Sequence, residues 1–519
     1  MNWTASQWIA LTPILITAAT IVVVMMAIAI RRHHRGNIAL CVIGLSLALL
    51  SCIYVWLSGI GSQMVTPLLQ VDHYALFYMG LILAITLACT TLAQPYLEGY
   101  QGNREELYLL MLLATLGGLV LACASHFVSF FLGLELLSIP LYGMIAYPHH
   151  RDRRALEGGI KYLVLSAVAS SFIVFGMALI YARTGTLSFQ SMAPLMASAQ
   201  SMHDTLLLAG GGMILVGIGF EVALVPFHLW TPDVYEGAPA PVTAWLSTAA
   251  KVAMFALLLR FFVEAGAYHS QLFLDILTVL AVLSMVIGNV LALQQTNLKR
   301  LLAYSAIAHF GYILVAFIAT GALAVEAVGV YLLTYAVTEL AAFGVISLMS
   351  SPLGEVDADE LFDYRGLFWR RPYLSSILTL SLLSLAGVPL TAGFMGKFYA
   401  AAAGIDARLW LLLAMLVLGS AIGLFYYLRA MVVLFLRPRW VQPFQAPQNW
   451  GTRAGGIAML ATALAILWLG IYPAPAINMI KAAGLPAQAP TISDAAAVTL
   501  NPPQTVKPVV ATAGRAGHG

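Results

Sequence analysis

Charged side chains inside long apolar segments are the part of this sequence that could do chemistry. The buried set comprises Glu135, Lys161, Glu221, Lys251, Glu339, Lys397 and Arg429, together with His309. Arg260 and Glu326 lie nearer to span ends, where their head groups are expected to reach the membrane surface. Each charge at a helix centre opposes membrane insertion by about 2.5–3.5 kcal/mol, so six or seven of them cost on the order of 15–20 kcal/mol. Fixed ion pairs could explain the neighbours Glu135 and Lys161, but dispersion over five or more helices favours a proton relay. A buried lysine holds or releases its proton according to whether an acidic partner is near.

These charges must be carried by membrane helices. The 519 residues are 61% hydrophobic and 9% charged, whereas soluble proteins carry about 25% charged residues. About 20 apolar residues span a bilayer core, and runs of that length begin near residues 9, 37, 73, 106, 126, 156, 205, 238, 271, 298, 323, 373, 408 and 453. The sequence therefore predicts an all-α integral membrane protein with about fourteen transmembrane helices. A tight turn near Ser125 leaves thirteen or fifteen open.

Two of the predicted spans contain helix breakers. Pro226 lies near the end of the seventh apolar run, and Pro389 lies in the middle of the twelfth. Proline removes a backbone donor, and in lipid such a break survives only where it is buried or lines a wet cavity. A structural kink is the alternative for either proline alone. Breaks in corresponding spans of two halves are typical of inverted repeats with a transport site near the membrane midplane.

Basic residues predict the orientation of the chain. Loops after odd-numbered spans hold most of the lysines and arginines, for example Arg31, Arg153 and Arg370, and such loops face the cytoplasm. Both termini are then expected on the periplasmic side. The segment from about Gly484 onward, rich in Ala, Pro and Thr, is expected to be a disordered tail. The small net charge of +3 gives no sign of nucleic-acid binding, and the sequence has no dinucleotide, phosphate-loop, iron–sulfur or haem motif.

Several long motifs resemble one known family. The segment Leu-Val-Pro-Phe-His-Leu-Trp-Thr-Pro-Asp-Val-Tyr-Glu-Gly-Ala-Pro-Ala-Pro-Val (224–242) resembles the signature of the antiporter-like subunits of respiratory complex I. Segments 131–141 and 295–312 resemble the fifth and tenth helices of that family. The resemblance implies two inverted five-helix repeats that contain broken helices 7 and 12. The implied division is helices 1–3 (1–105), the first repeat (106–265), the second repeat (266–440), helix 14 (441–483) and the tail (484–519).

The resemblance also implies roles for single residues. Glu135 and Lys161 match a glutamate–lysine pair on the fifth and sixth helices, while Lys251, His309 and Lys397 match proton-relay residues of helices 8, 10 and 12. The implied function is proton translocation driven by electron transfer elsewhere in an NADH-quinone oxidoreductase of a bacterial inner membrane. NADH, FMN, iron–sulfur clusters and quinone would then be held by other subunits, so no cofactor is expected in this chain. Its partners would be other membrane-arm subunits, including antiporter-like ones, and lipid.

Two acids depart from the family pattern. Glu221 stands where the seventh helix of the family carries a lysine, and Glu339 stands where a small polar residue is usual. Glu221 could form an ion pair with Lys251 and slow proton transfer, or it could carry the proton itself. Two further functions therefore stay open. The chain could belong to a related cation/proton antiporter or membrane-bound hydrogenase, or it could be a structural complex I subunit that has lost pumping.

Overall fold

Long apolar helices make up most of the structure. The computed structural model describes residues 4–98, 100, 102–148, 152–196, 204–350, 357–437 and 454–485. Within these residues, twelve helices are long and apolar enough to cross a membrane. They are α2 (Thr12–Ile30), α3 (His34–Leu57), α4 (His73–Leu97), α5 (Glu106–Cys123), α6 (Phe127–Ile145), α7 (Arg153–Thr184), α9 (Thr205–Val222), α11 (Ala240–Glu264), α12 (Gln271–Leu293), α13 (Leu298–Ala319), α14 (Gly321–Met349) and α18 (Trp410–Phe435).

The two remaining predicted spans are helical as well. Helix α16 (Pro372–Ala386) is a shorter apolar helix, and α19 (Ala454–Ile471) is followed by α20 (Ala474–Ala482) after a bend of 87°. Each of the fourteen predicted segments therefore begins a helix, which confirms the all-α membrane fold. The shorter elements are α1 (Ala5–Ala10), the hairpin of β1 (Gln63–Thr66) and β2 (Leu69–Val71), α8 (Phe189–Met196), α10 (Trp230–Gly237), η2 (Ala267–His269), η3 (Leu361–Tyr364), α15 (Leu367–Arg370) and α17 (Ala392–Asp406).

Short polar side chains fix where several spans begin. Asp72 accepts a hydrogen bond from the backbone N–H of Ala75 at 2.8 Å and so caps α4. Asp204 and Asn297 cap α9 and α13 in the same way. A carboxylate or amide oxygen at this position satisfies a backbone donor that has no partner inside the helix. The apolar runs therefore become helices with defined starts.

The breaks near Pro226 and Pro389 are confirmed, and the two have the same local geometry. Helix α9 ends at Ala223, which has a φ of 67°, and Leu224 donates its N–H to the carbonyl of Gly219 at 2.8 Å. Helix α16 ends at Gly387, which has a φ of 85°, and Val388 donates to Leu383 at 3.1 Å. A left-handed residue followed by a hydrogen bond to the carbonyl five residues earlier is a Schellman stop. Helices α10 and α17 continue the chain after each stop.

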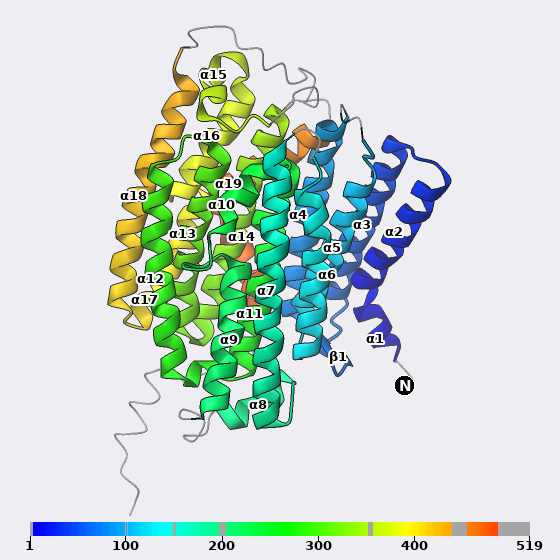
Figure 1. Cartoon of the computed structure of the whole chain (residues 1–519), viewed down its shortest axis with the longest axis vertical. Helices are drawn as coiled ribbons and strands as arrows, with labels where there is room; N and C mark the ends of the chain where they lie inside the picture. Colours follow the sequence, from blue (N-terminus) through cyan, green and yellow to red (C-terminus); the bar gives the residue numbers. More distant parts are fainter. Residues whose placement is uncertain are drawn as a thin grey trace, which may run out of the picture.

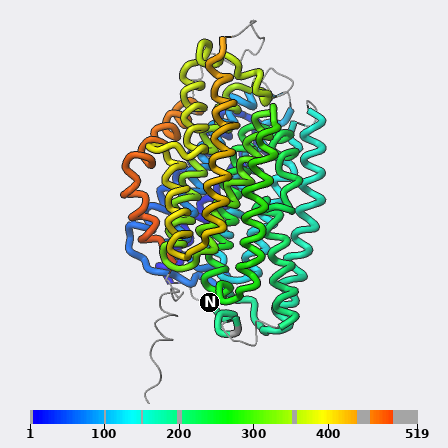
Figure 2. Tube along the Cα trace, turned by 90° about the vertical axis from the view of Figure 1, so that its left-hand side faces the viewer, coloured from blue at the N-terminus to red at the C-terminus, as the bar shows by residue number. Residues whose placement is uncertain are grey.

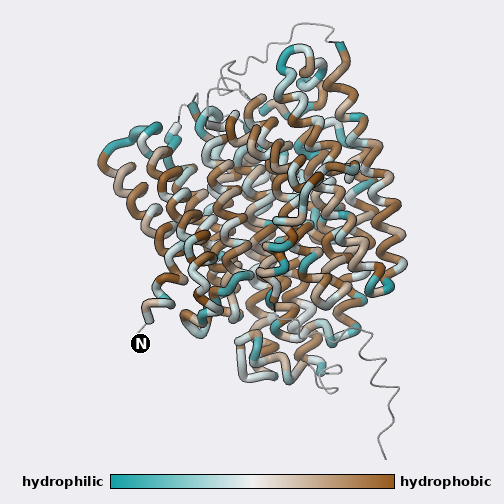
Figure 3. The backbone as a smooth tube through the Cα atoms, turned by 180° about the vertical axis from the view of Figure 1, so that it is seen from behind, coloured by the Kyte–Doolittle hydropathy of each residue, from teal (hydrophilic) through white to brown (hydrophobic). Residues whose placement is uncertain are grey.

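The central helices of the bundle are buried and the outer ones face outward. In the most apolar stretches of α11, α13 and α14, 89%, 94% and 89% of the residues are buried, whereas α2 has 22% and α18 has 33%. Figure 1 shows α2 and α3 at one edge of the bundle and α18 at the other, and Figure 2 shows the same bundle from the side. Figure 3 shows hydrophobic residues along most of the helices, with hydrophilic ones concentrated in the connections and at a few internal places.

The order of elements repeats along the chain. Helices α5, α6, α7, the broken pair α9–α10 and α11 are followed by α12, α13, α14, the broken pair α16–α17 and α18. Each set is five spans with the break in the fourth, as the proposed repeats require. The exact division at residues 105, 265, 440 and 483 stays a prediction. The predicted tail lies outside the described residues, except for its first two positions.

Arg260 does not lie where the sequence predicts it, near a span end with its head group at the membrane surface. Its side chain is fully buried, and its guanidinium contacts Asp72 at 2.9 and 2.7 Å and Glu264 at 3.2 Å. The ring of Tyr74 lies 4.8 Å from the guanidinium carbon. The two carboxylates replace the water that a surface arginine would contact. Because Asp72 caps α4 and Arg260 lies on α11, this ion cluster joins the two helices.

Candidate functional site

At the first break, Lys251 contacts the end of α9. The Lys251 ammonium, on α11, donates to the backbone carbonyl of Glu221 at 2.5 Å and lies 4.7 Å from the centroid of the Trp230 ring. Lys251 and Glu221 are 2% and 3% exposed. The negative pole of a helix favours a cation at its C-terminus, and the break leaves the carbonyl free to accept.

The Glu221 carboxylate does not form an ion pair with Lys251 among the described residues. Instead it accepts a hydrogen bond from Ser166 of α7 at 3.4 Å, and Ser166 in turn accepts from Tyr142 of α6 at 3.0 Å. The fixed ion pair that sequence reasoning left open is therefore not formed in this structure. The carboxyl group lies in a line of hydroxyl groups that leads across α7 to α6.

At the second break, Lys397 repeats the arrangement. Its ammonium, on α17, donates to the backbone carbonyl of Ala386 at the end of α16, at 3.0 Å. It lies 5.3 Å from the centroid of the Tyr312 ring, and the lysine is 8% exposed. Both broken helices thus end at a buried lysine from a later helix. Neither lysine forms an ion pair with a carboxylate among the described residues, so each can change its charge without breaking one.

His309 lies on α13, and hydroxyl groups contact both of its ring nitrogens. Nδ1 is 2.9 Å from the Tyr331 hydroxyl, and Nε2 is 3.3 Å from the Tyr427 hydroxyl. Tyr427 also hydrogen-bonds to Ser305, one turn earlier on α13. An imidazole between two hydroxyls can accept a proton on one nitrogen and give one up from the other.

A second polar line runs from Lys397 toward α18. The Tyr312 hydroxyl accepts from the Asn289 amide at 2.8 Å, and the Tyr426 hydroxyl donates to the Asn289 carbonyl oxygen at 3.1 Å. The rings of Tyr426 and Tyr427 lie 4.5 Å apart between centroids. Helices α12, α13, α17 and α18 therefore place one group of polar side chains around His309 and Lys397.

The predicted pair of Glu135 and Lys161 is not formed. Lys161 lies 2.6 Å from Glu157, one turn earlier on α7, and 2.6 Å from Asp233 on α10. Glu135 accepts a hydrogen bond from Ser170 at 2.6 Å instead. The pairing implied by the resemblance is therefore wrong for this structure, because two other carboxylates reach the ammonium.

Asp233 belongs to an ion network at one end of the bundle. Arg300 of α13 contacts Asp233 and Glu236, each at 2.7 Å, and Arg154 of α7 contacts Glu236 at 2.8 Å and Asp359 at 3.0 Å. The network joins α7 and α10 of the first repeat to α13 of the second. Sequence reasoning missed it, although Asp233 and Glu236 lie inside the recognised motif 224–242.

The other predicted buried charges have different surroundings. Arg429 of α18 donates to the carbonyls of Leu293 and Gln295, each at 2.7 Å, and so contacts the end of α12. Glu339 of α14 is fully buried, and neither of its carboxyl oxygens has a hydrogen-bond partner among the described residues. Arg429 therefore has a structural explanation, and Glu339 has none in the contacts.

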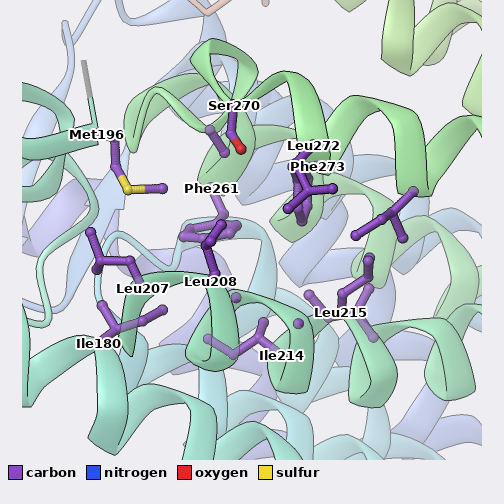
Figure 4. Close-up of a pocket in the computed structure, with 15 residues that line it drawn as sticks. Ile180, Met196, Leu207, Leu208, Ile214, Leu215, Phe261, Ser270, Leu272 and Phe273 are labelled. Carbon is purple, nitrogen blue, oxygen red and sulfur yellow. The ribbon is translucent and has the colours of Figure 1, made fainter. Parts of the chain in front are cut away.

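An apolar cavity lies apart from these charges. It has a volume of about 90 Å³ and is lined by side chains of α7, α8, α9, α11 and α12, among them Ile180, Leu207 and Phe273. Figure 4 shows these side chains around it, with the hydroxyl of Ser270 at its edge. Such a lining can hold hydrocarbon but offers no acid or base. Within the part of the chain that the structure describes, no group of three or more His, Cys, Asp or Glu side chains could hold a metal.

Comparison with known proteins identifies the family of this chain. Residues 124–423 match the family described as NADH:quinone oxidoreductase/Mrp antiporter, transmembrane. The chain belongs to this family. It is 56% identical over 494 residues to NADH-quinone oxidoreductase subunit N of Ectopseudomonas mendocina, covering 94% of this chain and 99% of that protein. Within the family, the segments 364–372 and 393–399 favour subunit N, and this relative confirms that prediction.

Solved structures share the fold. A chain of respiratory complex I from Thermus thermophilus is 33% identical, with a TM-score of 0.77 over 91% of this chain and 100% of that one. A chain of an archaeal membrane-bound sulfane sulfur reductase is 25% identical, with a TM-score of 0.78 over 92% and 97%. A chain of the Mrp complex from Dietzia sp. has a TM-score of 0.80 over 92% and 97% at 21% identity, which shows the fold alone. The antiporter-like architecture predicted from the motifs is thus confirmed.

Proposed function

We propose that this chain carries protons across the membrane as the antiporter-like subunit N of an NADH-quinone oxidoreductase. One observation supports the role of its own residues most directly. A buried lysine, Lys251 or Lys397, contacts the free carbonyls at the end of each broken helix, and neither is held in an ion pair among the described residues. These two positions, with His309 between them in the chain, are the proton-holding groups of the pathway.

The proposed transfer follows the buried polar groups described above. A proton enters from the end at which Lys161 and Asp233 lie, and passes by way of Glu221 to Lys251. His309 then exchanges protons with Tyr331 and Tyr427, and Lys397 releases the proton toward the opposite face. Glu135, which accepts a hydrogen bond from Ser170, lies near Glu221 on this route. Each transfer breaks one N–H or O–H bond and forms another, so no oxidant or reductant is needed in this chain.

Redox chemistry belongs to other subunits in this proposal. The relatives named as complex I chains are parts of an oxidoreductase, so this chain is a subunit of a translocase and not an enzyme by itself. NADH, FMN, iron–sulfur clusters and quinone are bound elsewhere, and the partners are other membrane-arm subunits and lipid. The membrane is the bacterial inner membrane. The connection between α2 and α3 and helix α15 lie at the end opposite the N-terminus (Figure 1), and their basic residues support a cytoplasmic position for that end.

Alanine at the two lysines tests the proposal. We expect Lys251→Ala and Lys397→Ala, each in the intact complex, to lower the number of protons moved per NADH oxidised, because alanine cannot hold a proton. Lys481→Ala is the matched control, since Lys481 lies on α20 with a largely exposed side chain and forms an ion pair with Glu326 at 3.5 Å. An unchanged ratio in both lysine variants, with normal assembly, would contradict proton movement through this chain.

The second candidate is a structural subunit of complex I that has lost pumping. Glu221 supports this candidate, because the family carries a lysine at that position. In that case the lysine variants would lower assembly of the complex but leave the proton ratio of the assembled fraction unchanged. Quantifying the assembled complex beside each proton measurement distinguishes the two functions.

A further inference from the structure

Glu339 is a buried acid that the proposed pathway does not use. It lies in the middle of α14, its side chain is 0% exposed, and both carboxyl oxygens lack a hydrogen-bond partner among the described residues. The same helix carries a second acid, Glu326, which contacts Lys481 at 3.5 Å. Glu326 has an ordinary ion pair near a helix end, whereas Glu339 has no cation to hold it as a carboxylate.

Two tyrosine hydroxyls near Glu339 are also without partners. Tyr235 lies on α10, directly after the first break, and Tyr335 lies one turn before Glu339 on α14. Both hydroxyl oxygens are buried without a hydrogen-bond partner in the described structure, and both tyrosines interact electrostatically with Glu339. Three residues from both repeats thus bring together polar atoms that lack protein partners. Buried polar groups are rarely left so.

This cluster adjoins the groups around His309. The Tyr335 ring lies 5.5 Å from the His309 ring between centroids. Tyr427, whose hydroxyl contacts His309, also interacts electrostatically with Glu339. On the other side, the Tyr235 helix begins with Trp230, which contacts the Lys251 ammonium. Glu339 therefore lies near Tyr235 of the first repeat and near the residues that surround His309 in the second.

A carboxyl group in this place is stable only when neutral. An ionised carboxylate without a cation or hydrogen-bond donor is costly to bury, whereas a carboxylic acid is both a donor and an acceptor. We propose that Glu339 is a protonated carboxylic acid that passes protons between the two halves of the chain, from the side of Lys251 to His309. This inference rests on the proposed function.

The transfer balances with groups already described. The O–H bond of Glu339 breaks, and an N–H bond forms on the unprotonated ring nitrogen of His309. The products are a carboxylate and an imidazolium, whose charges cancel as a pair. Proton transfer from the ammonium of Lys251 then restores the Glu339 acid and leaves a neutral amine.

Glutamine at position 339 is the test, because it keeps the shape of the side chain but cannot hold a proton. In the intact complex we expect Glu339→Gln to lose the share of protons per NADH that this chain carries, while assembly stays normal. Infrared absorption of the complex should also lose one protonated carboxyl band. Glu326→Gln is the matched control on the same helix. It should change neither the proton ratio nor the protonated carboxyl absorption.

Two results would overturn the proposal. The first is an unchanged number of protons per NADH in an assembled Glu339→Gln complex. The second is a protonated carboxyl absorption identical to that of the unsubstituted complex, which would show an ionised Glu339. Should Glu339→Gln fail to assemble, Glu339→Asp, which restores a carboxyl, supports the relay by recovering proton movement and overturns it by assembling without recovery. Failure of the proposed function is recognised separately, by unchanged proton ratios in Lys251→Ala and Lys397→Ala.

Discussion

Lys161 and Asp233 form an ion pair of 2.6 Å that joins α7 to the half-helix following the first break. The ammonium therefore reaches the broken helix and not Glu135, its expected partner. Since Asp233 also contacts Arg300 at 2.7 Å, Lys161 shares its acid with a cation of the second repeat. Any change that moves α10 alters both contacts together.

Replacing Asp233 with asparagine should release Lys161. Partly exposed ion pairs contribute about 0.2–1 kcal/mol each, so we expect Asp233→Asn to lower the stability of the chain only slightly. A double-mutant cycle with Lys161→Met, followed by thermal unfolding of the complex, should give a favourable coupling energy of that size. Glu157→Gln is the control, because Glu157 contacts the same ammonium at 2.6 Å from the same helix. Zero coupling between positions 161 and 233 would show that the contact is not formed in the complex.

Glu221 should act as a proton carrier and not as a fixed partner of Lys251. The Lys251 contact is with the backbone carbonyl of Glu221, so it survives a change of side chain. Glu221→Gln cannot hold a proton, and we expect proton transfer through this chain to slow by about 10²-fold or more. Glu221→Lys can hold one, although two ammonium groups at ~8 Å repel by about 2 kcal/mol at an effective dielectric of about 20. Proton movement equal in the glutamine variant and the unsubstituted complex would contradict the carrier role.

Gly393 should tolerate no side chain. A Cβ at this position would lie 1.9 Å from the backbone oxygen of Ser384, because α17 begins against α16 at the second break. We expect Gly393→Ala to destabilise the chain by about 1–3 kcal/mol and to lower the amount of assembled complex. Gly211→Ala is the control, because a Cβ there meets no atom within 4 Å. Normal assembly of Gly393→Ala would show that the two half-helices can separate freely.

Asp363 makes the stability of the connection before α15 depend on pH. Burial, with the nearby Asp359 and Glu360 carboxylates, raises the pKa of Asp363 from 3.8 to about 6. The neutral acid therefore stabilises this segment below pH 3.8, and that contribution is lost as the pH rises through about 6. We expect hydrogen exchange in residues 357–364 to quicken over this range relative to Asp363→Asn, measured at each pH. Parallel exchange curves for the two proteins would contradict the shift.

Sequence patterns predicted the spans and the breaks because both depend on local chemistry. Twenty apolar residues form a helix wherever lipid is the solvent, and Pro226 and Pro389 each remove a backbone donor that would continue the helix before them. The partners of Lys161 depend on where α10 lies after the break, which no local pattern contains. Arg260 was placed near the surface for the same reason, since Asp72 lies far away in the sequence and reaches it only in the folded bundle.

The site was predicted in its residue types and not in its contacts. Lys251, His309 and Lys397 stand out in the sequence because charge is rare in apolar runs. Their partners are backbone carbonyls and tyrosine hydroxyls, which are common and carry no distinctive spacing. Asp233 lay inside a recognised motif but was not singled out, because an acid at the end of a span is unremarkable until its cation is known.

The two lysine-capped helix ends make the backbone sensitive to the charge of a side chain. While Lys397 is positive it offsets the negative pole of α16, and when the proton leaves that pole loses its counter-charge. The free energy of the half-helix therefore rises at the moment of proton release, and the same holds for α9 and Lys251. At each break, the loss of one proton from a lysine therefore strains the end of a helix. Such strain can be transmitted along a membrane arm.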